Sequence, residues 1–437
     1  MANINSVLCI DNSGSMSSPS GHTTSLGAAK HDASMFAMFQ HTTAELGMVS
    51  FNTTATTGFT LTAMSLSNKL LLSHKLYALS ATGLTNIQDA LNKASALLTN
   101  SQASNSIVLL TDGYANRGTL PPVKPTNSPP IYAIGLGNSV NTTDLQNLAS
   151  TTGGHYYHTP GIHTLSQMYN DIVAQARMGA VLTNTQGSVG TSGLSATTSV
   201  SGGAGPIRIG VAWDNQGLTY TSGTPGTNQI RLSVQCPAGT SLPAAPTAQG
   251  AGFVMYEIAS PGAGTYSSLV TCNPQSSTSA TIGAVDTSLT TSFAYSAPAT
   301  APLGKSIVVP CHVADADGST VSGWSMSGFV DSPSIDPQEV IARNRAALDA
   351  LDMGDIPPEE VNDNQRLLLL DAQRGPDQPL LPRHRAPVEI AHGPGENRVS
   401  FTPQTRGVHI VTVKAVGHAP AAGREFSLVR VMTILVE

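Results

Sequence analysis

The sequence predicts two kinds of fold in one chain: an α/β domain with a parallel sheet flanked by helices, followed by antiparallel β-sandwich modules. The first prediction depends on an alternation of apolar strands and helix-like segments up to about residue 180. The second depends on a change in composition, since eight charged residues are spread over positions 186–330 among short apolar runs punctuated by Gly and Pro. We expect domains at residues 1–182, 183–290 and 291–437.

Short apolar runs in the first domain are bounded by turn residues, which favours strands, and longer segments between them have helical spacing. A parallel sheet with helices on both faces follows from this order. Expected strands lie at 6–10, 46–51, 107–110 and 131–134, with 57–62 as an antiparallel edge strand, and expected helices lie near 26–40, 65–79, 87–98, 143–149 and 165–177.

Two connecting segments of the second half have recognisable compositions. Residues 183–206 are rich in Ser, Thr and Gly, which is typical of a linker or of the first polar strands of the next domain. The Pro-Gly pair within 260–268 suits a type II turn, so we expect a hairpin there.

Residues 331–398 carry 13 of the 27 acidic residues and seven of the 21 basic ones. The run Asp336-Pro337-Gln338-Glu339 is typical of a helix N-terminus, and Pro357-Pro358 begin a second helix. We therefore expect a helical-hairpin insertion at about 334–372 in the last sandwich domain. The alternative is a charged, solvated linker with helical tendency.

The net charge of -6 is mild for 437 residues and predicts no nucleic-acid partner. Cys236 and Cys272 both lie in β-rich stretches, so an inter-strand disulfide and two free thiols are both open. No apolar run reaches the ~18 residues of a membrane span, and the N-terminus leaves no room for a signal peptide. As written, the chain is expected in the cytoplasm; non-classical export to the cell surface, or a trimmed sequence, is the alternative.

Polar side chains follow two apolar strands at the points where these strands end. Asp11, Ser13 and Ser15 come directly after the first strand, Asp112 follows a fully apolar strand, and Thr85 lies in a Gly-containing loop before a helix. The carboxyl ends of parallel strands meet at one edge of a sheet, and carboxylate and hydroxyl oxygens suit Mg²⁺. The simpler interpretation is helix capping by the serines and an ordinary turn at the second aspartate.

Together, these motifs resemble a von Willebrand factor type A domain with a complete metal-ion-dependent adhesion site, an Asp-x-Ser-x-Ser motif followed by a threonine and an aspartate. The resemblance extends over "LGMVSFNTTA", "GLTNIQDAL" and "VLLTDGYANRG" to about residue 180. It implies a Rossmann-like sheet with Mg²⁺, or Mn²⁺ or Ca²⁺, at its edge. Ser13, Ser15 and Thr85 would then ligate the ion directly, and Asp11 and Asp112 through water, which leaves one position open for an acidic side chain of a partner. The later strands look like immunoglobulin-like or fibronectin-like modules.

No nucleophile, phosphate-loop or metalloprotease motif is present, so we expect no enzyme. His155, His158 and His163 lack a complementary set of ligands, and we assign them no zinc site. The leading hypothesis is a metal-dependent binding or adhesion protein whose partner presents an Asp or Glu, with self-assembly as a further expectation. The alternatives are a structural subunit with a vestigial or merely stabilising metal site, and an intracellular co-chaperone or adaptor of an AAA+ ATPase.

Overall fold

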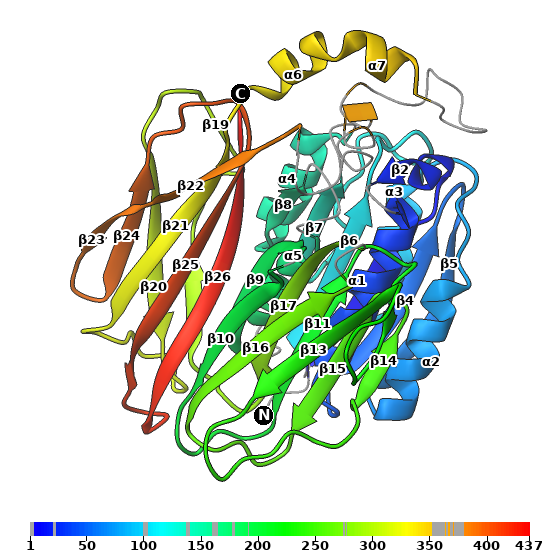
Figure 1. Ribbon diagram of the computed structural model, residues 1–437. Coiled ribbons are helices and arrows are strands. Elements are labelled where there is room, and N and C mark those ends of the chain that lie inside the picture. The colour runs from blue at the N-terminus through cyan, green and yellow to red at the C-terminus, as the bar shows by residue number, and fades with distance from the viewer. Residues whose placement is uncertain are drawn as a thin grey trace. The chain divides into compact units, whose positions relative to one another are not determined.

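The computed structural model consists of two compact units, Met1–Leu165 with Ile341–Gln373, and Ser166–Val340 with Arg374–Glu437 (Figure 1). None of the helices described is both long and apolar enough to cross a membrane. The structure describes residues 4–20, 23–98, 104–136, 140–159, 165–176, 180–190, 192–273, 276, 278–351, 363, 366–367, 370 and 380–437.

A six-stranded sheet in the order β5-β4-β1-β6-β7-β8 forms the centre of the first unit. All neighbouring strands are parallel except β5, which pairs antiparallel with β4 at one edge. The inner strands are buried along most of their length, which explains their continuous apolar sequence. The strands are β1 (Ile4–Asp11), β4 (Glu45–Phe51), β5 (Ala55–Ala63), β6 (Ser104–Thr111), β7 (Ile131–Leu136) and β8 (Tyr156–Thr159), with a small hairpin of β2 (Pro19–Ser20) and β3 (Thr23–Thr24).

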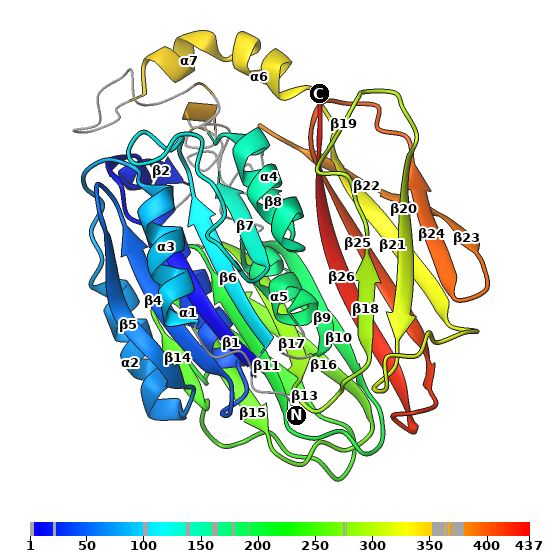
Figure 2. The ribbon, with the colours of Figure 1, turned by 180° about the vertical axis from the view of Figure 1, so that it is seen from behind.

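Helices cover both faces of this sheet, with α1 nearer the viewer in Figure 1 and α3 nearer the viewer in Figure 2. Polar caps fix where they begin: the side chains of Thr24, Asn86 and Asn141 each accept a hydrogen bond from the first turn of the following helix. These helices are α1 (Ser25–Phe39), α2 (Leu66–Tyr77), α3 (Ile87–Leu97) and α4 (Thr142–Thr152), and a short 3₁₀ helix, η1 (Gly14–Ser17), follows β1. The fold class predicted for this part of the chain is confirmed.

Among its described residues, the second unit contains four β-sheets, which share apolar cores in two pairs. The first sandwich pairs the sheets β14-β15-β11-β17-β9 and β10-β16-β13-β12, and the second pairs β18-β20-β24-β23 with β19-β26-β25-β21-β22. Neighbouring strands are antiparallel except in the pairs β12 with β13 and β19 with β26. The strands of the first sandwich are β9 (Ala180–Val189), β10 (Leu194–Val200), β11 (Ile207–Trp213), β12 (Thr219–Tyr220), β13 (Gln229–Gln235), β14 (Ala248–Gly250), β15 (Phe253–Ile258), β16 (Gly264–Cys272) and β17 (Thr278–Asp286). Those of the second are β18 (Ser292–Tyr295), β19 (Thr300–Ala301), β20 (Ile307–Ala314), β21 (Ser325–Pro333), β22 (Arg383–Pro387), β23 (Glu389–His392), β24 (Glu396–Phe401), β25 (Gly407–Ala419) and β26 (Arg424–Val436).

Helix α5 (Leu165–Gln175) is attached to the second unit by a buried polar network. The Asp171 carboxylate accepts hydrogen bonds from the Tyr295 hydroxyl at 2.9 Å and from the backbone N–H of Val431 at 3.2 Å. Arg430 Nε lies 3.9 Å from the same carboxylate and donates to the carbonyl of Phe293 at 2.6 Å. Because Asp171 and Arg430 are both buried, each charged side chain needs these partners to offset the loss of its hydration.

The structure tests the predictions for both connecting segments of the second half. Residues 183–206 contain β10 and most of β9, so they are strands rather than a linker. The predicted hairpin at the Pro-Gly pair is wrong, because β15 and β16 belong to different sheets. Both edges of β15 are already occupied by β11 and β14, so the chain crosses to the other sheet instead.

The predicted insertion begins with a helix at the predicted proline, α6 (Pro337–Arg343). This helix ends before Asn344, and a separate short helix, α7 (Arg345–Asp349), follows. The second predicted helix, from Pro357, lies largely outside the described residues. Cys236 and Cys272 are free thiols, and Cys272 Sγ lies 3.1 Å from the carbonyl of Ser276. The predicted domain limits and the immunoglobulin-like or fibronectin-like topology stay predictions.

Candidate metal site

Two aspartates lie side by side at the carboxyl edge of the central sheet. Strands β1 and β6 are parallel neighbours with Ile10 opposite Leu110, so Asp11 and Asp112 emerge next to each other. Both carboxylates are buried, with at most 2% of either residue exposed. The sequence therefore brings two acidic groups into one apolar setting, where each needs a partner.

The Asp11 carboxylate is oriented by two donors. Its Oδ1 accepts the backbone N–H of Ser13 at 2.8 Å, and its Oδ2 accepts the Thr111 hydroxyl at 2.5 Å. Both donors are buried, so the carboxylate is held by groups that do not exchange with bulk water. This fixed position suits an oxygen donor at a metal site better than a freely rotating surface aspartate would.

Serine hydroxyls connect the two carboxylates. Ser13 Oγ lies 3.2 Å from Ser15 Oγ, and Ser15 Oγ donates to Asp112 Oδ1 at 2.7 Å. Neither serine side chain caps the 3₁₀ helix that follows β1, since the N-cap position, Ser13, makes no side-chain capping bond. The simpler interpretation, in which these serines cap a helix, is therefore wrong.

The loop that carries Thr85 is fixed by the segment after β6. The backbone N–H of Thr85 donates to Asn116 Oδ1 at 2.8 Å, and its carbonyl accepts the backbone N–H of Asn116 at 3.1 Å. A Cβ atom built on Gly113 would lie 3.5 Å from Ser15 Oγ and 3.7 Å from Thr85 Oγ1. Both hydroxyls thus face one small space beside Asp112, which the glycine leaves open.

A second glycine positions this loop against the start of the chain. Gly83 has φ +78°, a left-handed conformation that favours glycine, and a Cβ there would lie 2.7 Å from Thr53 Oγ1. Its carbonyl accepts the backbone N–H of Gly14 at 2.9 Å. The loops that carry Ser13, Ser15 and Thr85 are therefore joined through their backbones.

The electrostatics of the pair favour a bound cation. Burial raises the pKa of Asp11 to about 6. Burial, followed by the charge of Asp11, raises the pKa of Asp112 to about 8. Asp112 Oδ2 has no hydrogen-bond partner among the described residues. Two buried carboxylates, three hydroxyls and one unpartnered oxygen fit a hard divalent cation that accepts oxygen ligands.

Sequence reasoning missed two residues that orient the predicted ones: Thr111, which donates to Asp11, and Asn116, which holds the backbone of Thr85. The sequence signal that could have identified Thr111 is its position directly before Asp112, at the end of a buried strand. Within the described parts of the chain, no three His, Cys, Asp or Glu side chains gather as metal ligands, and His163 lies outside them.

Residues 5–171 match the family model of the von Willebrand factor type A domain. This stretch of the chain is therefore a domain of that class, which commonly mediates protein–protein interaction or adhesion. No curated protein shows significant similarity to the chain.

The chain is also similar to several solved structures. A von Willebrand factor type A protein from Catenulispora acidiphila is 14% identical, with a TM-score of 0.36, over 73% of this chain and 63% of that chain. BatB from Bacteroides thetaiotaomicron is 18% identical, with a TM-score of 0.32, over 38% of this chain and 97% of that chain. Proximal thread matrix protein 1 from the mussel byssus is 16% identical, with a TM-score of 0.33, over 44% of this chain and 50% of that chain.

Proposed function

We propose that the chain is a non-enzymatic binding protein whose N-terminal domain captures an acidic side chain of a protein partner through a divalent cation. The observation that carries the proposal is Asp112 Oδ2, a buried carboxylate oxygen without a described partner, beside a second carboxylate. Ser13, Ser15 and Thr85 would hold the ion, with Asp11 and Asp112 around them. When bound, the ion supplies positive charge for the two aspartates and a coordination position for a further oxygen ligand.

The residues of the chain have separate tasks in this proposal. Thr111 and the Ser13 backbone keep Asp11 oriented, and Asn116 keeps the Thr85 loop in place. Few direct carboxylate ligands would leave the ion electrophilic enough to attract an acidic group of the partner. Gly113 leaves the space beside Ser15 and Thr85 open for this approach.

The test is calorimetric titration of Mg²⁺, and separately Mn²⁺, into the full chain after treatment with a chelator. We expect saturable binding that is lost in Asp112→Asn and kept in Asp317→Asn, a matched change at a fully exposed aspartate of the second sandwich. The Asn side chain still accepts the Ser15 hydroxyl, so loss of binding would report the charge. Absence of saturable binding by the folded wild-type chain would contradict the proposal and favour the structural-subunit alternative.

A further inference from the structure

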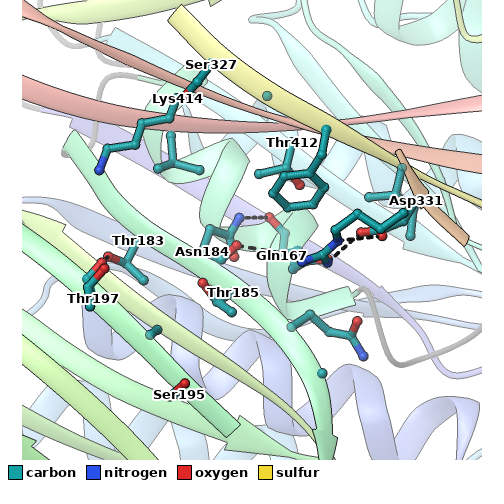
Figure 3. Close-up of a pocket in the computed structure, with 18 of the residues that line it drawn as sticks. Gln167, Thr183, Asn184, Thr185, Ser195, Thr197, Ser327, Asp331, Thr412 and Lys414 are labelled. Atoms are coloured by element: carbon teal, nitrogen blue, oxygen red, sulfur yellow. Dashed lines mark hydrogen bonds and ion pairs between the residues drawn. The ribbon is translucent and has the colours of Figure 1, made fainter. Parts of the chain in front are cut away.

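The second unit contains a groove of about 740 Å³ whose lining includes no residue of the metal site (Figure 3). One wall comes from β9 and β10 of the first sandwich, with Gln167 of α5, and the other from β21, β22, β25 and β26 of the second sandwich. Its volume is within the range of ligand sites in proteins. The lining is mostly hydroxyl, amide and charged side chains, so the expected ligand is polar.

The wall from the second sandwich is the outer face of one sheet. On β25, Ile410, Thr412 and Lys414 line the groove, whereas Val411 and Val413 between them are in the apolar core. The register places Ser327 of β21 opposite Lys414, four residues along the strand from Ile410. The face is therefore a regular platform, and it is about 13 Å long from Ile410 to Lys414 of β25.

Positive charge dominates the platform: three cations, Arg383, Arg385 and Lys414, face one acid, Asp331. Arg385 is neutralised by Asp331, with N–O distances of 2.8 and 2.9 Å, and its guanidinium lies 3.9 Å from the centre of the Phe329 ring. Arg383 donates to the backbone carbonyls of Asp331 and Val408, which carry no charge.

Two of the three cations thus have no carboxylate ion-pair partner within the described residues, namely Arg383 and Lys414. Arg383 is an exposed residue, so a ligand in the groove can reach its charge. An anion in the groove would stabilise this charge.

The opposite wall contains β9, the last strand of its sheet. Its residues 182–184 are buried, and residues 185–187 are partly exposed. Six consecutive residues of β9, from Leu182 to Gly187, line the groove, whereas a strand that presented one face would contribute alternate residues. Strand β9 pairs with β17 on one side, and no described strand pairs with its other side. Part of this edge is already used, because Gln167 Nε2 donates to the carbonyl of Asn184 at 3.3 Å.

We propose that this groove binds an extended acidic peptide of a partner protein, which pairs through its backbone with the free edge of β9 and directs carboxylates to Lys414 and Arg383. The open edge favours a peptide over an acidic polysaccharide, because a sugar chain lacks the alternating N–H and C=O groups that pair with a strand. The surplus of positive charge favours acidic side chains over neutral ones. This site uses no residue of the metal site and needs no metal.

The experiment is fluorescence anisotropy of the full chain with a labelled ten-residue peptide of alternating Glu and Thr, in the presence of a chelator. We expect saturable binding, at least tenfold weaker for the same peptide with Gln in place of Glu. Lys414→Glu should weaken binding at least tenfold, whereas Lys305→Glu, at an exposed position outside the groove, should change it less than twofold. Circular dichroism checks folding, and Lys414→Gln replaces the charge-reversal variant if that variant unfolds.

Backbone pairing has a test of its own. One version of the peptide carries N-methyl groups on its odd-numbered residues, and a second version carries them on its even-numbered residues. Only one of these sets of N–H groups can face β9, so that version should bind at least tenfold more weakly than the other. Equal binding of both versions, unchanged binding to the folded Lys414 variant, or no saturable binding would overturn the proposal. Binding of an oligogalacturonate in place of the peptide would overturn it as well. Because the chelator is present throughout, none of these outcomes depends on the metal site.

Discussion

Asp112→Asn should stabilise the metal-free protein at pH 8, although it removes a residue that we assign to the metal site. The substitution keeps an oxygen acceptor for Ser15 and removes a buried negative charge beside Asp11. A rise in the pKa of Asp112 from 3.8 to about 8 corresponds to roughly 6 kcal/mol against the ionised form. The loops can adjust and water can enter the metal-free site, so we expect about a third of this, ~2 kcal/mol. For the α/β domain, this is a rise in melting temperature of about 4–8 °C.

The direction of the pH dependence follows from the same pKa. The folded-state pKa of Asp112 lies above its unfolded value, so its contribution to stability is present below about pH 3.8 and is lost as the pH rises towards 8. Differential scanning calorimetry of the chelated wild-type and variant chains at pH 4 and pH 8 measures the effect. The rise in melting temperature caused by Asp112→Asn should largely disappear at pH 4. The control Asp317→Asn should shift the melting temperature by less than about 1 °C at either pH. A variant that melts below wild type at pH 8, or that gains as much at pH 4, would refute the reasoning.

Two further predictions concern the Gly83 turn and the buried network of α5. Gly83→Ala introduces a Cβ at φ +78° against Thr53, so we expect a loss of ~1–2 kcal/mol in thermal unfolding and weaker Mg²⁺ binding by calorimetry. Unchanged values in both measurements would show that the loop tolerates the side chain. Arg430→Met leaves the buried Asp171 carboxylate without its cation and should cost about 3 kcal/mol in urea unfolding. Arg398→Met, at an exposed arginine, should cost less than about 0.5 kcal/mol, and equal losses in the two variants would contradict the assigned role of Asp171.

Much of the α/β domain could be predicted because its signals are local. Continuous apolar runs such as the one before Asp112 identify buried parallel strands, and the polar residues after them are placed by the topology of the sheet. Thr111 and Asn116 could not be found in this way, because their role depends on which atom of a distant residue each side chain reaches.

The β-rich half shows the limits of local signals more clearly. The Pro-Gly turn was a good turn signal, but the occupied edges of β15 decided which strand could follow it. The groove could not be predicted either, since Thr185, Asp331 and Lys414 come from three separated segments and its charge balance exists only after they meet. The capping signal at Asp336 placed the start of α6 correctly, but it could not predict where that helix ends.

The attachment of α5 to the last strand has a consequence for how the chain is made. Asp171 is bonded to the backbone of Val431, which lies 260 residues later in the sequence. During synthesis from the N-terminus, the partner of this carboxylate on β26 is therefore made long after α5 itself. Until β26 has been made, α5 cannot bury Asp171 against its cation, so the second unit cannot complete its folding before then. A nascent chain that stops short of β26 would leave exposed the apolar side chains of the second sandwich that pack with this strand.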